Sequence, residues 1–427
     1  MRYLALTEQD RKSMLQEIGV ENVNQLFDAV PQEFLLKKPI QNLSNHLGEI
    51  EVEAYLKNLA NKNNVAGNNP FFLGVGCYKH HIPATVDHLI QRSEFLTSYT
   101  PYQPEISQGT LATVFQFQSI ISLLTGMEIS NASMYDGATA MAEACLMALR
   151  IKNQKKKIAL FGDIHPDYIE VTKTYLELSN SQLVEIDKAD DSCSAIVVQY
   201  PNFYGEIVDL EKVRKKCDEI GALMIVVVNE ILSLGLINPP SQADIVVGEA
   251  SSIGVGLNFG GPLLGFFASK KEFVRQMPGR ICGKTIDADG KEGYVLTLNA
   301  REQHIRREKA TSNICSNQGL CATAFTIHSS LLGEIGFKKL ALINHYKACK
   351  MAEMLGNISG IKILNSSFFN EFTIEFNMEA KIVNKKLLEE NIIGGLAVGN
   401  KMIIAVTELT SDEDMNKLSS SLKRILS

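Results

Sequence analysis

Between residues 158 and 267, short apolar runs alternate with longer stretches of helical periodicity. The runs are apolar on both faces of an extended chain, and such strands are typical of a parallel sheet covered by helices on both sides. The predicted strands are Ile158–Phe161, Ala195–Gln199, Leu223–Val228, Ile245–Val247 and Leu263–Phe267. Helices are predicted over Asp167–Leu178 and Leu210–Ile220. The fold class is therefore α/β, with a mainly parallel sheet.

A length of 427 residues predicts two or three domains. We expect an N-terminal helical segment and interface arm over residues 1–106, a large α/β domain over 107–320 and a small α+β domain over 321–427. A helix capped by Ser107 opens the large domain. The small domain combines a long helix through Leu355 with strands and shorter helices. Its predicted strands are Gly360–Leu364, Phe372–Phe376 and Met402–Val406, and its shorter helices are Lys381–Glu390 and Ser411–Ile425.

Charge and hydropathy exclude several classes of function. The net charge is -6, which argues against binding to nucleic acid or to an anionic membrane. The longest clean apolar run, Ala222–Val228, is far shorter than the ~20 residues of a membrane span. The N-terminus resembles neither a secretory signal nor a transit peptide. We therefore expect a cytoplasmic protein without membrane or nucleic-acid partners.

The absence of certain motifs excludes further classes. The eight cysteines include no C-x-x-C pair, which argues against zinc ribbons and iron–sulfur clusters. No G-x-G-x-x-G motif follows an early strand, so a nicotinamide site has no support. Neither a G-x-S-x-G elbow nor an H-E-x-x-H helix occurs, so serine hydrolases and zinc proteases are excluded.

The segment NASMYDGATA (131–140) precedes a run of helical character. Backbone N–H groups at such a helix start, together with the Thr139 hydroxyl, suit a phosphate group. The alternative is a tight loop in which Asp136 or Thr139 merely caps the helix.

Polar side chains also follow two of the predicted strands, where α/β proteins place ligand contacts. His165 follows the first strand and could stack on a cofactor ring, or it is an ordinary loop histidine. Asn229 and Glu230 follow Leu223–Val228, and an acid there could pair with a ring nitrogen or simply be a capping carboxylate. The next loop, Glu249–Gly265, is rich in glycine and contains no lysine.

Two further segments are unusual. Phe71–Thr110 carries many Tyr, His and Pro residues with little apolar periodicity, and long irregular segments of this kind are usually functional loops or interface arms. Arg301–Gln318 begins with a dense basic cluster and runs into a Thr-Ser-Asn turn. This segment is either a solvated helix end or an arm that binds an anion or a partner.

Taken together, these segments resemble one family, the glycine cleavage system P-protein (decarboxylating glycine dehydrogenase), in the form that is split into two subunits. The resemblance is to subunit 1. The segments NASMYDGATAMAEA and ADIVVGEASSIGVGLNFGGPLLGFFA carry it, the long stretches SYTPYQPEISQGTL and REQHIRREKATSNIC make it specific, and it extends from Met1 to about Gln318.

The resemblance implies the fold type I architecture of pyridoxal-phosphate enzymes. In this family, pyridoxal phosphate decarboxylates glycine, and the remaining aminomethyl group passes to the lipoyl arm of the H-protein. The cofactor needs a Schiff-base lysine, which lies on the loop after the strand that corresponds to Ile245–Val247. Glu249, Ala250, Ser251 and Ser252 occupy that place in this chain. Pyridoxal phosphate is therefore expected on the partner, subunit 2 (beta), in an α2β2 heterotetramer, and not covalently on this chain.

The resemblance also assigns candidate site residues. Contributors to the partner's active site would be Tyr99, Tyr102, Gln103 and Glu105, with Thr311, Ser312 and Asn313 as contacts to the partner's cofactor phosphate. The chain's own vestigial pocket would contain Asp136, Gly137, Ala138, Thr139, His165, Glu230 (or Asn229 in its place), Ser251 and Ser252.

Three alternatives remain open. The candidate loops could only pack the subunit interface. The chain could be a stand-alone pyridoxal-phosphate enzyme that uses a displaced lysine such as Lys270. It could also be a purely structural subunit that contributes nothing to the partner's active site.

Overall fold

The computed structural model describes residues 6–38, 40–43, 46–97, 100–314 and 317–427. The chain divides into two compact units, Met1–Asn63 and Asn64–Ser427. The first unit contains helices α1 (Glu8–Ile18) and α2 (Glu49–Ala60), neither of which has a buried residue. Two short 3-10 turns lie between these helices, over Val23–Phe27 and Gln32–Phe34.

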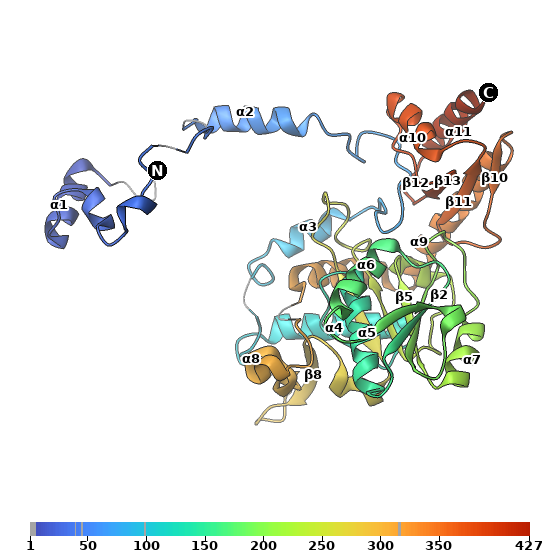
Figure 1. Cartoon of the computed structure of the whole chain (residues 1–427), viewed down its shortest axis with the longest axis horizontal. Coiled ribbons are helices and arrows are strands. Elements are labelled where there is room, and N and C mark those ends of the chain that lie inside the picture. Colours follow the sequence, from blue (N-terminus) through green and yellow to red (C-terminus); the bar gives the residue numbers. More distant parts are fainter. Residues whose placement is uncertain (1–5, 39, 44–45, 98–99, 315–316) are drawn as a thin grey trace. The chain divides into compact units, whose positions relative to one another are not determined.

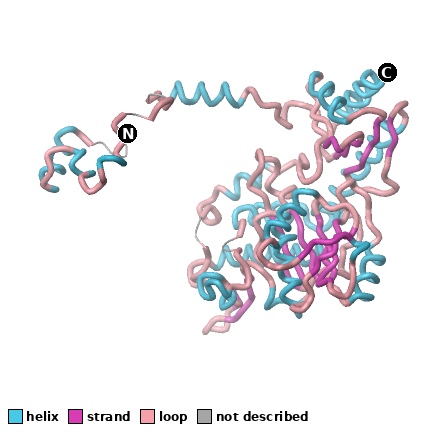
Figure 2. Tube along the Cα trace, viewed as in Figure 1, coloured by secondary structure: helices cyan, strands magenta, loops and turns pink. Residues whose placement is uncertain are grey.

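The second unit is built around a seven-stranded sheet with the strand order β1-β7-β6-β5-β4-β2-β3 (Figures 1 and 2). Its five strands from β2 to β6 are parallel. The seven strands are β1 (Ile129–Ser130), β2 (Lys157–Phe161), β3 (Gln182–Glu185), β4 (Cys193–Gln199), β5 (Leu223–Val228), β6 (Ile245–Glu249) and β7 (Gly265–Ser269). The predicted α/β class with a mainly parallel sheet is confirmed.

Helices cover both faces of this sheet. On one face, α5 (Gly137–Ile151) and α6 (Pro166–Leu176) pack against alternate residues of the central strands, among them Ile225 and Val227. On the other face, α4 (Gln108–Thr125), α7 (Leu210–Ile220) and α9 (Gly319–Gly356) pack against the residues in between. Successive side chains of a strand point to opposite faces, so strands that are apolar throughout supply both cores.

One predicted strand runs in the opposite direction to its neighbours. The strand predicted at Leu263–Phe267 is β7, which pairs antiparallel with β6. The loop that connects β6 to β7 contains no helix. Two parallel neighbouring strands need a crossover connection, which is usually a helix. Because no helix connects β6 to β7, the chain returns antiparallel.

The C-terminal part of the second unit contains an antiparallel sheet with the order β10-β11-β13-β12. The last turns of α9 and helices α10 (Ala380–Glu389) and α11 (Asp412–Leu426) pack on this sheet and form a separate core. The four strands are β10 (Ile361–Ile363), β11 (Glu371–Phe376), β12 (Leu396–Val398) and β13 (Lys401–Ala405). The domain boundaries at residues 106/107 and 320/321 stay predictions.

Helix α9 has the length and composition of a membrane span, but half of its most apolar window is buried inside the protein. It also bends at Gly333, whose φ of 59° is not helical. These features are those of a core helix in a packed domain.

The remaining elements flank the sheet. The hairpin of β8 (Ile281–Ile286) and β9 (Glu292–Thr297) was not predicted, although Asp289-Gly290 in its connection is a common hairpin signal. Short helices α3 (Ala84–Ile90) and α8 (Gln303–Arg306) lie in the two segments that the sequence marked as irregular or basic. Ser107 precedes α4 as predicted, but its hydroxyl makes no capping hydrogen bond.

Candidate functional site

The first turn of α5 follows the loop that the sequence marked as a phosphate site. Asp136 caps the helix, because its Oδ1 accepts the Thr139 N–H at 2.7 Å, while Thr139 Oγ1 accepts the Asp136 N–H at 3.3 Å. Gly137 is buried, and Ala138 is half-buried behind it. The capping alternative is therefore confirmed, whereas phosphate binding at this turn stays a prediction.

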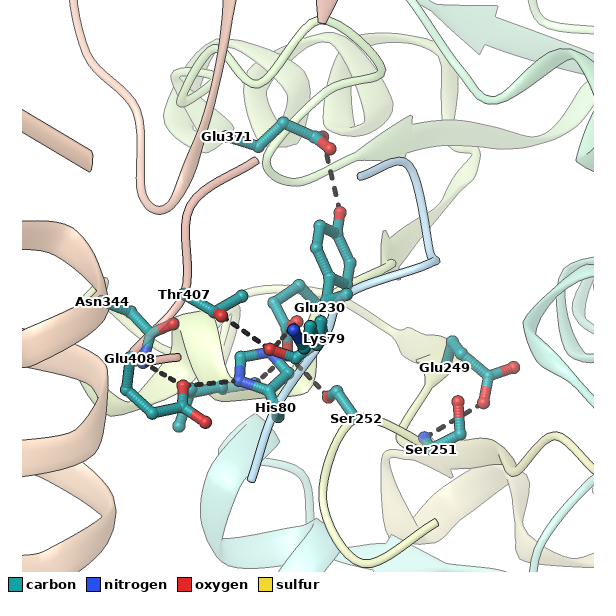
Figure 3. Close-up of polar contacts among 12 residues, drawn as sticks. Lys79, His80, Glu230, Glu249, Ser251, Ser252, Asn344, Glu371, Thr407 and Glu408 are labelled. Carbon is teal, nitrogen blue, oxygen red and sulfur yellow. Dashed lines mark hydrogen bonds and ion pairs between the residues drawn. The ribbon is translucent and has the colours of Figure 1, made fainter. Parts of the chain in front are cut away.

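A carboxylate of the chain itself occupies that helix start. Glu249, the last residue of β6, accepts the Gly137 N–H on Oε2 at 3.1 Å. Its Oε1 accepts the Ser251 N–H at 3.1 Å and the Leu264 N–H at 2.8 Å. Burial raises the pKa of Glu249, and these N–H groups act in the opposite direction. Figure 3 shows Glu249 beside Ser251, on the loop where a cofactor lysine was expected.

Aromatic side chains fill the space between this helix start and the end of β5. The Tyr168 hydroxyl donates to Asn229 Oδ1 at 2.9 Å, and a Cβ on Gly137 would lie 2.3 Å from the same hydroxyl oxygen. The His165 ring stacks on Tyr168, with ring centroids 5.1 Å apart. Burial lowers the pKa of His165. His165 therefore stacks on a tyrosine of the protein, and its stacking on a cofactor ring stays a prediction.

Glu230 takes part in a different contact, with a histidine from the irregular segment Phe71–Thr110. His80 is buried, with Nε2 3.0 Å from Glu230 Oε2 and Nδ1 2.9 Å from Glu408 Oε2. The Ser252 hydroxyl donates to Glu230 Oε1 at 2.7 Å, and the Asn344 amide donates to Glu408 at 3.0 Å. Figure 3 shows His80 between the two carboxylates, with Ser252 on the side of Glu230.

This cluster joins three parts of the second unit: the segment before α3, the end of β5 and the loop after β13. Burial by itself would lower the pKa of His80, but Glu230 and Glu408 raise it to about 10. Burial would raise the pKa of Glu408, whereas its contacts with His80, the His81 N–H and Asn344 lower it to about 2. His80 is therefore a buried imidazolium that holds two carboxylates. We call His80, Glu230 and Glu408 the histidine clamp.

A second buried acid lies beside the clamp, on β11. Glu371 accepts the Val75 N–H at 2.5 Å and the Tyr78 hydroxyl at 3.4 Å. Burial is the main reason why the pKa of Glu371 rises to about 8. Residues that include Tyr78, Asn229 and Glu371 line a cavity of about 10 Å³, enough for about one water molecule.

We expect the variant Glu371→Gln to be more stable than the wild-type chain at high pH. Because the pKa of Glu371 is higher in the folded than in the unfolded state, the folded chain binds more protons and stability falls between about pH 4.5 and pH 8. A neutral glutamine removes this fall and gains about 1 kcal/mol or more at pH 9. Urea unfolding of both chains at pH 5 and pH 9 measures the effect, and parallel pH profiles would contradict it.

In the irregular segment Phe71–Thr110, which we call the Tyr-rich arm, Tyr102 is the candidate residue with the best-defined contacts. Tyr102 is about half exposed, and its oxygen accepts an N–H of the buried Arg280 at 2.9 Å. The edge of the His304 ring meets the Tyr102 ring at 5.5 Å between centroids. Since Arg280 donates to the phenol oxygen, the phenol proton is free to point away from the chain. Gln103 and Glu105 are exposed, and Tyr99 lies outside the described residues.

The Thr311-Ser312-Asn313 turn lies at the edge of a basic pocket. The Thr311 N–H donates to the Arg301 carbonyl at 3.0 Å, and Ser312 Oγ accepts the Ile314 N–H at 3.0 Å. Asn313 is exposed. The pocket has a volume of about 330 Å³ and is lined by Arg275, Leu298, Ala300, Arg301, Arg306, Lys309 and Thr311. In the part of the chain that the structure describes, none of its four cations forms an ion pair with a carboxylate.

The structure thus separates the predicted pocket residues into three clusters. Gly137 and Ser251 bond to Glu249, with Asp136 and Thr139 capping the same helix start. His165 stacks on Tyr168, which bonds to Asn229. Glu230 belongs to the histidine clamp, and Ser252 bonds to it. His80, Glu371 and Glu408 were missed. The only sequence signal for His80 was the histidine pair of YKHH in a segment without periodicity, and it does not identify the residues that His80 contacts. Glu371 and Glu408 had no such signal.

The whole chain is similar to proteins of known name. The family model described as glycine cleavage system P-protein matches residues 1–422. The probable glycine dehydrogenase (decarboxylating) subunit 1 of Parvibaculum lavamentivorans is 50% identical, and that of Erythrobacter litoralis is 48% identical, with full coverage of both chains in each case.

Solved structures agree with these matches. A crystal structure of glycine decarboxylase (P-protein) of the glycine cleavage system, in inhibitor-bound form, has a TM-score of 0.92 and 39% identity over all of both chains. A glutamate decarboxylase from Lactobacillus brevis has a TM-score of 0.68 at 12% identity, over 94% of this chain and 98% of its own, and so shares the fold. The fold is therefore that of the fold type I pyridoxal-phosphate enzymes, as the sequence predicted.

Proposed function

The chain belongs to the glycine cleavage system P-protein family, and from this membership we propose that it is the cofactor-free half of a two-subunit glycine decarboxylase. In this proposal the partner, subunit 2, holds pyridoxal phosphate. The complex decarboxylates glycine and passes the aminomethyl group to the lipoyl arm of the H-protein. This chain completes the partner's active site and has no cofactor of its own.

The position of Glu249 carries the proposal. A fold type I enzyme needs a lysine after the strand corresponding to β6 and a free helix start for the cofactor phosphate. Here no lysine occurs between Glu249 and Gly265, and the Glu249 carboxylate accepts the N–H of Gly137 at the start of α5. A phosphate dianion in the same place would meet a buried carboxylate. The residues of this chain therefore do not fit the cofactor.

The position of Lys270 counts against the alternative of a stand-alone enzyme. Lys270 Nζ lies 2.5 Å from Asp244 Oδ1. Asp244 immediately precedes β6, whereas Glu249 ends it. The lysine therefore lies at the opposite end of this strand from the helix start of α5, too far away to form an imine with a cofactor bound there.

We further propose that the arm residues act in the partner's active site. Tyr102 is the best-supported contributor, because Arg280 fixes its phenol oxygen and leaves its proton for an acceptor outside the chain. Glu105 is exposed close by in the sequence and would exchange a proton with the substrate or order its amine. Gln103 and Tyr99 belong to the same arm. The Thr311-Ser312-Asn313 turn, at the edge of the basic pocket, would contact the partner's cofactor phosphate.

Assembly with the partner follows from this division of roles. An active site built from two different chains requires a permanent interface, and such interfaces are large and apolar. The relatives carry the name subunit 1, which supports a second subunit. We propose an α2β2 heterotetramer in the cytoplasm, with the lipoylated H-protein as a transient partner.

Borohydride trapping tests the location of the cofactor. This chain, the partner and the reconstituted complex are each incubated with pyridoxal phosphate, reduced and digested. We expect a pyridoxyl-lysine peptide from the partner alone. A reduced peptide from this chain, at Lys270 or elsewhere, would establish the stand-alone alternative. Full glycine decarboxylation by the partner without this chain would establish a purely structural role.

We expect the variant Tyr102→Phe to slow glycine decarboxylation by the reconstituted complex. The variant loses the hydrogen bond that the Tyr102 hydroxyl would donate to a charged acceptor in the partner's active site. Such a bond contributes about 1.5–3 kcal/mol, which corresponds to a fall in kcat/KM of about 10–100-fold. Tyr346→Phe, at an exposed tyrosine on α9, is the matched control and should leave the rate unchanged. Both complexes must elute with the wild-type size in gel filtration. Wild-type rates for Tyr102→Phe in an intact complex would remove Tyr102 from the mechanism.

A further inference from the structure

Glu249 has the surroundings of a bound oxyanion. Its two oxygens accept three backbone N–H groups, from Gly137 at the start of α5, Ser251 on the following loop and Leu264 just before β7. These donors come from three separate segments and converge on one carboxylate. Among the described residues no cation forms an ion pair with it, so N–H groups and the dipole of a 15-residue helix supply its stabilisation.

The surrounding backbone is built closely around this carboxylate. A Cβ on Gly137 would lie 2.3 Å from the Tyr168 hydroxyl oxygen, and one on Gly248 would lie 1.8 Å from the Val228 carbonyl oxygen. The two glycines therefore let the helix start, β5 and β6 approach one another. Glycine at a helix start keeps side chains away from its N–H groups, which is the usual construction of a phosphate cradle.

We propose that Glu249 is a tethered anion that takes the place of the cofactor phosphate and closes a cradle whose donors are still in position. This inference rests on the proposed function, because that function identifies the cradle as an ancestral cofactor site. It adds that Glu249 is the residue that closes the cradle. It also adds the ligand class, a small oxyanion such as phosphate, which the cradle would bind once the Glu249 carboxylate is removed.

The test is the thermal unfolding of the full chain in rising concentrations of inorganic phosphate, with sodium chloride used to keep the ionic strength constant. We expect no phosphate-specific change in the wild-type Tm. Glu249→Ala should unfold at a lower temperature in chloride, and phosphate should raise its Tm by about 2 °C or more, as mass action requires for a ligand that binds only the folded chain. Hydrogen exchange of the Gly137 and Leu264 amides should slow in the same titration.

Two further variants make the test specific. Glu371→Ala also removes a buried carboxyl group that accepts a backbone N–H, but Glu371 does not lie at the start of a long helix, and phosphate should not restore the Tm of this variant. Glu249→Gln keeps the volume of the side chain, so it should be destabilised without restoration by phosphate. Glu249→Ser is a second opening variant, for the case that the alanine chain does not fold.

A second titration with pyridoxal phosphate distinguishes binding of free inorganic phosphate from binding of the cofactor through its phosphate group. Because Tyr168 and Asn229 fill the space beside the helix start, pyridoxal phosphate should raise the Tm of Glu249→Ala no more than inorganic phosphate does. An equal phosphate response in the wild-type, Glu371→Ala and Glu249→Ala chains, or no response in both opening variants, would refute the inference. Neither result depends on glycine turnover or on trapping of the partner's lysine, so the proposed function is tested separately.

Discussion

Replacing His80 by alanine is expected to lower the free energy of unfolding by about 3–5 kcal/mol, the usual loss when one member of a buried ion pair is removed. The side chains of His80 and Glu230 are 1% and 3% exposed, and that of Glu408 is 13% exposed. Without the imidazolium, two carboxylates stay buried with no cation between them. The cost is large because Glu230 is 3% exposed and cannot reach water without separating the segments that the clamp joins.

The effect should depend on pH with a definite sign. His80 has a pKa of about 10 in the folded chain, above its value of about 6.5 in an unfolded chain. Its stabilising contribution is therefore complete below about pH 6.5 and is lost as the pH rises towards 10. The wild-type chain should lose stability over this interval by a step that the alanine variant lacks.

Urea unfolding at pH 6, 8 and 10 measures both effects. His81→Ala is the matched control, since His81 is exposed and contributes only its backbone N–H to Glu408. It should change the free energy of unfolding by less than about 0.5 kcal/mol. If His80→Ala were as stable as His81→Ala at pH 6, the clamp would not be a stabilising ion pair.

The variant Gly205→Ala is expected to be destabilised by about 3 kcal/mol, the second large effect. Gly205 has a φ of 85°, in the left-handed region that disfavours a side chain. A Cβ at this position would also lie 2.3 Å from the Glu371 carbonyl oxygen on β11. The clash involves backbone, so a side-chain rotation cannot relieve it, and overpacking adds about 1–3 kcal/mol to the strain.

Gly290→Ala separates the two causes. Gly290 has a similar φ of 81°, but a Cβ there would meet no atom within 4 Å. Only the conformational strain of about 1 kcal/mol is expected in this control. The difference between the two variants in urea unfolding therefore measures the close contact between the loop after β4 and β11. Equal losses would mean that this contact relaxes without cost.

Much of the fold was predictable because its signals are local. Strands β4 and β5 are apolar at consecutive positions, and α7 has its apolar residues at helical spacing, so periodicity identified all three. Strand β7 runs antiparallel within the mainly parallel sheet, and β1, β3, β8, β9 and β12 were missed. Strand direction depends on the connection between strands, and strands at the edge of a sheet have weak apolar patterns.

The site was predictable only in part. The sequence placed the helix start of α5, His165, Glu230 and the loop after β6 near one end of the sheet, because parallel strands present their carboxyl ends at the same edge. It did not indicate that Glu249 would turn back onto Gly137, 112 positions earlier in the chain. Nor did it indicate that the acid paired with His80 would come from residue 408, after the last strand.

The amino-acid sequence alone determined the alternation of helices and buried strands and the absence of a lysine from the loop after β6. Both are properties of neighbouring residues. Only the tertiary structure decided which charges meet: the helix start of α5 receives a carboxylate, and two glutamates share one buried imidazolium. The reason is that hydrogen bonds and ion pairs act over a few ångströms, and strand order and domain packing decide which distant residues come within that range.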